Sequence, residues 1–338
     1  MLAAVIERPG ELCVREVPDL VIDETECLVE ILACALCNST DRKLVAGHFR
    51  YRGPEMYPAI LGHESVGRVV QCGRRVTAFR EGDLVLRAGA SYPPGAGPSS
   101  LFGGLAQFGK VKDPAHGGSP LQQVLPADLD PVDATMLVTL KETLSWLQRW
   151  PVAAGQSVVV LGSGPVGLGF GFFAKLLGCE PVIVLGRRPE PLQRALDLGA
   201  ADVVINTADA DPAAVVRQAT GGRGADRVID AVGDDDLVAL GFTLLATGGR
   251  IGLYGITSTH TPGDMERRHF AVPMARLEWS LDCFNPQEAA PHAQMLALVR
   301  SGRVRLRDWY THVVPLAETA RGLELLARRE AFKVVVNV

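Results

Sequence analysis

Two short stretches near the start of the chain carry residue types that bind transition metals. Cys37 is followed by Asn-Ser-Thr40-Asp41, and a Gly-His63-Glu64 triplet lies about 25 residues further on. A thiolate, an imidazole and a carboxylate suit Zn²⁺. Taken singly, Cys37 could be a small buried hydrophobic residue and His63 a hydrogen-bonded turn histidine, and neither alone indicates a metal site.

Cys34 and Cys37 also form a CxxC pair. No second pair follows at the spacing of a zinc finger or ribbon, and the βαβ context of a redox motif is missing. We therefore expect Cys34 to belong to the core of a strand. The seven cysteines are an odd number without the density of a disulfide framework, so we expect reduced thiols.

A glycine-rich turn provides the second chemical signal. Gly162-Ser-Gly164-Pro165-Val166-Gly167 directly follows the apolar run 157–161 and precedes a helical pattern. In a dinucleotide fingerprint the first glycine permits the turn, the second admits the pyrophosphate, and the third lets helix pack on strand. The helix N-terminus then faces the phosphates. The alternative is an ordinary strand-to-helix turn that is rich in glycine.

The end of the next apolar run indicates which dinucleotide binds. A carboxylate there would accept hydrogen bonds from the adenosine ribose hydroxyls. The chain instead has Gly186, followed by Arg187 and Arg188. Two guanidinium groups can contact a 2′-phosphate. We therefore expect NADP(H), with NAD(H) as the alternative if the arginines only begin a solvated helix.

The elements around these motifs change character along the chain. The first hundred residues hold short apolar runs typical of strands, such as 28–36 and 65–73, and the segment 89–120 is rich in Gly, Pro and Ser. A helical pattern covers 133–150. Short strands then alternate with helical segments, which predicts an α/β fold with a doubly wound parallel sheet. The strands are expected at 157–161, 181–185, 201–205, 226–232 and 249–256.

Composition narrows the class of function. The length of 338 residues and 47% hydrophobic content favour two domains. A formal charge of -4 gives no basic field for nucleic acid or anionic lipid. With neither a signal-peptide pattern nor a long apolar stretch, we expect a cytoplasmic protein that acts on small molecules, without nucleic-acid or membrane partners.

Taken together, these motifs resemble the medium-chain dehydrogenase/reductase superfamily, in its zinc-dependent alcohol, polyol and threonine dehydrogenase branch. Gly62-His63-Glu64 continues as SVGRVVQCGRRVTAFREGDLV, similar to the family's GHE signature. Further matches are GGLAQFGKV, the dinucleotide fingerprint, DRVIDAVG, GGRIGLYG and the segment AFKVVVNV. The resemblance spans nearly the whole chain.

The resemblance implies a fold and a partition of the chain. Residues 1–138 and 280–338 would form a GroES-like, β-rich catalytic domain. Residues 139–279 would form a Rossmann domain that binds the dinucleotide, with the active cleft between the two. Family members are usually dimers or tetramers, so the resemblance implies a homodimer or homotetramer.

The resemblance also implies the site's roles. Cys37, His63 and Glu64 would hold one catalytic zinc, which binds the substrate oxygen while hydride passes to or from the nicotinamide. Asp41 would orient the ligand histidine, and Thr40 would take the alcohol proton. Lys43 stands where many members carry a relay histidine, and it could pass protons, contact the cofactor or be a surface cation.

Three departures from the family pattern bear on the metal. One extra residue separates Cys37 from Asp41. The loop 91–104 contains no cysteine, so we expect no structural zinc. Val138 occupies the place where the family supplies another ligand or water-holding residue. Glu142, one helical turn later, is expected on a solvated helix face, and the alternative is that it substitutes for the missing ligand.

Two other classes of function stay open. A zinc-free NADPH-dependent reductase of quinones or activated alkenes would explain Val138 but would not need Cys37 and the GHE triplet. A redox-sensing protein that only binds the dinucleotide would show no turnover.

Substrate identity depends on pocket shape, and the resemblance favours polyols, sugars and amino alcohols. Segment 47–52, with two cations and two aromatics, is either an exposed loop or a contact for a hydroxylated or phosphorylated substrate. The aromatics Trp279 and Phe284 are further candidates for the substrate pocket.

Overall fold

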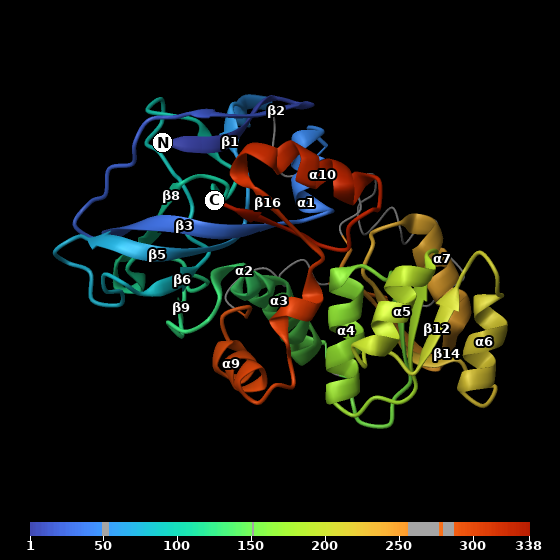
Figure 1. Cartoon of the computed structure of the whole chain (residues 1–338). Helices are drawn as coiled ribbons and strands as arrows, with labels where there is room; N and C mark the ends of the chain where they lie inside the picture. The colour runs from blue at the N-terminus through green and yellow to red at the C-terminus, as the bar shows by residue number, and fades with distance from the viewer. Residues whose placement is uncertain (49–53, 151, 256–276, 280–286) are drawn as a thin grey trace. The chain divides into compact units, whose positions relative to one another are not determined.

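The computed structural model describes residues 1–48, 54–150, 152–255, 277–279 and 287–338 (Figure 1). The chain divides into two compact units. Unit 1 comprises Met1–Val138 and Gln294–Val338, and unit 2 comprises Thr139–Ala293. In the described part of the chain, no helix has the length and apolarity that crossing a membrane requires.

Unit 1 is built from two sheets of mostly antiparallel strands. The larger sheet has the order β16-β17-β3-β5-β6-β9, with β8 also paired to β3, and the smaller has the order β2-β1-β4-β7. The strands of the larger sheet are β16 (His312–Pro315), β17 (Val334–Asn337), β3 (Glu26–Leu36), β5 (Glu64–Cys72), β6 (Leu84–Leu86), β9 (Val124–Leu125) and β8 (Phe108–Lys112). Those of the smaller sheet are β2 (Glu11–Glu16), β1 (Leu2–Arg8), β4 (Ala59–Ile60) and β7 (Ser99–Ser100).

Short helices complete unit 1. These are α1 (Thr40–Val45), α2 (Pro131–Ala134), α10 (Thr319–Ala327) and the 3₁₀ turns Pro54–Met56, Pro114–His116, Leu306–Trp309 and Leu316–Glu318. The helices α3 (Met136–Arg149) and α9 (His292–Arg300) run across the boundaries between the units. Strand β17 pairs with β3, so a segment from the end of the sequence lies inside the main sheet of unit 1.

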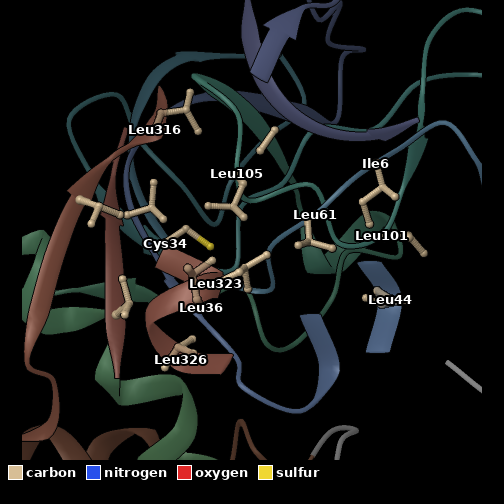
Figure 2. Close-up of a cluster of buried hydrophobic side chains, with 14 of the residues drawn as sticks. Ile6, Cys34, Leu36, Leu44, Leu61, Leu101, Leu105, Leu316, Leu323 and Leu326 are labelled. Atoms are coloured by element: carbon tan, nitrogen blue, oxygen red, sulfur yellow. The ribbon is translucent and has the colours of Figure 1, made fainter. Parts of the chain in front are cut away.

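One hydrophobic core of unit 1 gathers leucines from distant segments. Figure 2 shows Leu101 and Leu105, which flank Phe102 in the sequence, in the same cluster as Leu61 and Leu323. All four are largely buried. Cys34 is also fully buried in this cluster, which confirms its prediction as strand core.

Unit 2 has a sheet with the order β12-β11-β10-β13-β14-β15, in which every pairing is parallel. The strands are β12 (Val203–Asn206), β11 (Val182–Gly186), β10 (Val158–Leu161), β13 (Ala225–Asp230), β14 (Leu245–Leu253) and β15 (Leu277–Trp279). The helices are α4 (Pro165–Leu176), α5 (Pro189–Asp197), α6 (Pro212–Ala219) and α7 (Asp235–Leu244).

Helices α4 and α5 cover one face of this sheet, and α6 and α7, which contact each other, cover the other (Figure 1). The chain starts at β10, winds outward to β12 and then returns past β10 to β13. This reversal is the switch point at which doubly wound sheets bind dinucleotides. The predicted α/β fold is confirmed, and each of the five predicted strands overlaps a strand of this sheet.

Candidate metal centre and dinucleotide cradle

Strand pairing brings the two metal-binding stretches together. Cys37 directly follows β3, and His63 directly precedes β5. The two strands are antiparallel neighbours in which Ala35 pairs with Glu64. The end of β3 therefore meets the start of β5, although the stretches are far apart in the sequence.

The three side chains predicted as ligands form one cluster. The ligand atoms of Cys37, His63 and Glu64 all lie within 4.8 Å of one another, and no other such cluster of His, Cys, Asp and Glu occurs among the described residues. His63 Nε2 lies 3.8 Å from Glu64 Oε1. Ligands at the 2.0–2.3 Å distances of a tetrahedral zinc are about 3.5 Å apart. The donor set and its spacing therefore fit zinc.

The Asp41 carboxylate contacts both Cys37 and His63. The carboxylate is fully buried, and its Oδ2 accepts a hydrogen bond from the backbone N–H of Cys37 at 2.8 Å. Its Oδ1 lies 3.2 Å from His63 Nδ1. One carboxylate thus contacts both the cysteine turn and the imidazole, whose Nε2 faces the Glu64 carboxylate.

The charges in the cluster support one another. Burial opposes ionisation of Cys37, but His63 and Lys333 outweigh it, so the pKa of the Cys37 thiol is lowered. Burial likewise opposes the charge on His63, but Asp41 and Cys37 raise the pKa of its imidazole well above the usual value. The cysteine is therefore favoured as a thiolate, the form that binds a metal.

Lys333 also contacts this cluster, although it was not predicted from the sequence. Its Nζ donates to Glu64 Oε1 at 2.6 Å, and both side chains are almost completely buried. The lysine directly precedes β17, whose Val334 pairs with Leu36 at the end of β3. The available signal was a lysine next to the apolar run VVVNV, a place where an unpaired charge would be costly.

The other residues predicted for this region differ in burial and in their contacts. Thr40 opens α1, and its backbone N–H donates to Cys37 Sγ at 3.4 Å. Lys43 is half-buried on the same helix. Val138 is fully buried and has no atom that can bind a metal. The expectation that Glu142 lies on a solvated helix face is wrong, because it is buried and accepts a hydrogen bond from Tyr254 Oη at 3.1 Å in unit 2.

The glycine-rich turn in unit 2 has the form that a pyrophosphate requires. A side chain at Gly167 would collide with the carbonyl of Gly162, which adopts φ +114°, so both positions need glycine. A Cβ at Gly164 would meet nothing within 4 Å. The open face at Gly164 and the close packing at Gly167 match the two glycine roles of a dinucleotide cradle.

The start of α4 supplies donors to this open face. Pro165 has no N–H, and the first bond of the helix runs from Leu168 N to Gly164 O at 2.9 Å. The N–H groups of Val166 and Gly167 are thus left without a partner inside the helix. A helix N-terminus of this kind attracts phosphate.

The residues that we expect to select the coenzyme follow at the end of β11. A side chain at Gly186 would collide with Ser163 of the glycine-rich turn, so this place has no room for the usual acid. Arg187 is exposed and Arg188 is half-buried, immediately before α5 begins at Pro189.

Some predicted substrate contacts lie outside the described residues. These are positions 49–52 of the segment 47–52, and Phe284. Trp279 ends β15.

Comparisons with known proteins agree with this architecture. The model of the alcohol dehydrogenase GroES-like domain matches residues 23–117, and that of the zinc-binding dehydrogenase matches residues 165–280. L-threonine 3-dehydrogenase of Bacillus licheniformis is 26% identical over 99% of this chain and 98% of its own length.

Solved structures are also similar over the whole chain. Alcohol dehydrogenase TADH from Thermus sp. ATN1 is 28% identical, with a TM-score of 0.80 and full coverage of both chains. A zinc-binding dehydrogenase from Sinorhizobium meliloti, solved bound to NADP, is 22% identical with a TM-score of 0.79 and covers 100% of this chain and 99% of its own.

A GroES-like unit with a thiolate, imidazole and carboxylate cluster, joined to a Rossmann unit, defines the zinc-type dehydrogenases. The chain belongs to the medium-chain dehydrogenase/reductase superfamily, in its zinc-dependent alcohol dehydrogenase-like branch. It is therefore an oxidoreductase.

Proposed function

We propose that this enzyme moves a hydride between NADP(H) and the carbon of an alcohol or carbonyl substrate, with one catalytic zinc and no structural zinc. The observation that carries the proposal is the meeting of Cys37, His63 and Glu64 within 4.8 Å. Zinc, when bound, is a Lewis acid that polarises the substrate oxygen. The substrate class by analogy is polyols, sugars and amino alcohols, and the relative from Bacillus licheniformis is named for threonine.

The chain's own residues have separate tasks in this proposal. Cys37 and His63 hold the metal, and Glu64 joins them through the carboxylate that also meets Lys333. Asp41 keeps His63 in the orientation that presents Nε2. Thr40, at the start of α1, takes the proton of the alcohol, and Lys43 on the same helix passes it onward or contacts the cofactor.

NADP(H) is the proposed coenzyme because of three residues at the end of β11. Gly186 supplies no carboxylate to repel a 2′-phosphate. Arg187 and Arg188 supply guanidinium groups that can contact it. The pyrophosphate would lie against Gly164 and the N–H groups of Val166 and Gly167. We also propose, by family analogy, that the enzyme is a homodimer or homotetramer.

A zinc-free quinone or enone reductase is the second candidate. Its support is that Val138 cannot bind a metal and that Glu64 is already engaged by Lys333. The paired Cys37 and His63, both directed by Asp41, have no task in such an enzyme, and this favours the zinc-dependent reaction.

One experiment separates the two candidates. A panel of alcohols, aldehydes, ketones, quinones and enones is assayed with NADP(H) and NAD(H), and the zinc content of the same preparation is measured. We expect turnover of alcohols and carbonyls, a higher kcat/KM with NADP(H), and at most one zinc per chain. Cys37→Ala and His63→Ala should each lose the zinc and at least about 100-fold in kcat, as expected when a Lewis acid is removed.

Cys179→Ala, a buried thiol in unit 2, is the matched control and should leave zinc content unchanged. Full turnover of verified metal-free enzyme, unaffected by Cys37→Ala, would support the zinc-free reductase instead. Two zincs per chain would show that a structural site exists. A clear preference for NAD(H) would refute the roles given to Arg187 and Arg188.

A further inference from the structure

Backbone strain in the described residues is concentrated around His63. Three residues other than glycine adopt a positive φ, namely Arg87 at 59°, Phe102 at 77° and Arg329 at 62°. Arg87 Nη1 donates to the backbone carbonyl of His63 at 2.8 Å, and the Phe102 ring lies against the His63 ring. Such conformations persist only where the surrounding structure enforces them, and they cluster at functional sites.

The conformation of Phe102 is enforced from both sides. Leu101 and Leu105 are fully buried in the core of unit 1 and anchor the loop (Figure 2). The carbonyl of Phe102 packs so closely on Gly89 that any side chain there would collide with it. The N–H of Ala90 donates to the carbonyl of Gly103 at 2.9 Å. The loop therefore has little freedom to turn the Phe102 ring elsewhere.

The ring itself is not part of the core. Phe102 is 45% exposed, whereas the other Phe, Tyr and Trp side chains described in unit 1 are buried or half-buried. Its ring centroid is 5.1 Å from that of His63, and the two planes are tilted by 53°. A phenyl ring normally stabilises a protein by being buried. Here a strained backbone instead holds an apolar ring at the edge of the metal cluster.

We propose that the Phe102 ring is an apolar wall of the substrate site and selects substrates with a flat apolar group, aryl or alkenyl, on the reacting carbon. This inference rests on the proposed zinc-dependent hydride transfer, and it replaces the class of polyols, sugars and amino alcohols that analogy alone suggested. Such a group gains contact with the ring, because aromatic rings pack well in offset or edge-to-face arrangements. A polyhydroxylated chain placed there would leave hydroxyl groups without hydrogen-bond partners. The selected class is therefore aryl or allylic alcohols and aldehydes, rather than polyols.

The test removes the ring and the strain together. Phe102→Gly suits a positive φ, so the variant should fold with an unchanged or higher Tm. Phe102→Leu keeps an apolar but non-planar side chain. Arg329→Gly, which relieves the same kind of strain just after α10, is the matched control. The substrate pair is benzyl alcohol and erythritol.

We expect Phe102→Gly to lower kcat/KM for benzyl alcohol by about 10- to 100-fold and to change that for erythritol by less than about 3-fold, the scale set by one hydrophobic contact. The kcat/KM of Phe102→Leu for benzyl alcohol should lie between those of the wild type and Phe102→Gly. Arg329→Gly should keep the wild-type ratio of the kcat/KM values for the two substrates. An unchanged ratio in Phe102→Gly would overturn the proposal. An equal loss for both substrates would also overturn it, because the ring would then only support His63.

A binding measurement separates this inference from the proposed function. Benzamide and glycolamide are unreactive carbonyl probes, flat apolar and hydroxylated respectively, and calorimetry gives their dissociation constants on zinc-loaded enzyme with coenzyme. Benzamide should bind about 10-fold or more weakly to Phe102→Gly, and glycolamide equally well to both proteins. Ring-dependent binding of benzamide without turnover of any alcohol or carbonyl would refute the proposed function alone. Turnover with ring-independent binding and selectivity would refute this inference alone.

Discussion

A single buried lysine sets the charge next to the proposed metal ligands. Lys333 and Glu64 form an ion pair that is almost completely removed from solvent. Burial opposes the charge on Lys333, but Glu64 and Cys37 outweigh it and raise the pKa of the lysine. An ion pair of this kind is costly to break, because the remaining charge has no solvent to stabilise it.

Replacing Lys333 alone should therefore be strongly destabilising. In chelator-treated protein, Lys333→Met should lower the free energy of unfolding by about 3–5 kcal/mol, whereas the double variant Lys333→Met, Glu64→Gln should lose much less. Denaturant titration of both proteins measures the difference. Lys333→Arg is the conservative control. A loss below about 1 kcal/mol in Lys333→Met would show that Glu64 finds another partner.

Residues of this kind mark the limit of what the sequence could predict. Cys37, His63 and Glu64 were predicted from their types and from a family resemblance, and the structure brings them together. Lys333 could not be predicted, because its contact depends on the register of β17 against β3. The prediction for Glu142 failed because helical periodicity does not reveal which face a second element covers. The positive φ of Phe102 depends on glycines that are distant in sequence.

At the scale of elements, the parallel sheet was easier to predict than the GroES-like unit. Short β-branched runs such as VVVL of β10 are fully buried and alternate with helices, and right-handed crossovers then limit the strand orders that are possible. In unit 1 the pairings join segments far apart in sequence, such as β17 with β3. Periodicity shows that these segments are strands, but it does not show which strand each one joins.

The end of β13 carries a buried acid with a consequence for stability. Asp230 accepts hydrogen bonds from the N–H groups of Val232 and Gly233. Burial raises the pKa of Asp230 to about 6, against the effect of those bonds. An unfolded chain has an aspartate pKa of about 3.9, so the folded protein holds this proton more tightly.

The stability that this proton contributes should be fully present below about pH 4 and lost as the pH rises to about 6, by about 3 kcal/mol in total. Asp230→Asn keeps an acceptor for the backbone and removes the ionisation. The free energy of unfolding, measured with urea from pH 4 to 7, should therefore fall less steeply with rising pH for this variant than for the wild type. Asp197→Asn, an exposed carboxylate on α5, is the control and should follow the wild type. If the free energy of unfolding changed equally with pH in Asp230→Asn and in the wild type, the raised pKa of Asp230 would be contradicted.

At the scale of the whole molecule, we expect the fold not to depend on the metal. Unit 1 has its own hydrophobic core, and the ligand side chains already have partners in Asp41 and Lys333. Sites that need a metal to fold are those of small domains without such a core.

Chelation should consequently remove activity without unfolding the protein. With Val138 in place of another ligand, a chelator should strip the zinc readily. Far-UV circular dichroism should keep its shape, and Tm should fall by no more than about 10 °C, the size expected when a bound ligand is lost. Zinc add-back should restore turnover. Loss of the circular dichroism signal on chelation would show that the metal holds unit 1 together.

The position of β17 also determines the order in which the enzyme can be assembled. Unit 1 starts at the first residue but closes only when the segment after residue 293 joins β3 and delivers Lys333 to Glu64. A ribosome makes the whole of unit 2 before that segment, and domains tend to fold as they emerge. During synthesis the dinucleotide cradle should therefore be complete first, and Lys333 should reach Glu64 only after β17 has been made. Unit 1, whose first strands are synthesised before unit 2, should therefore be completed after it.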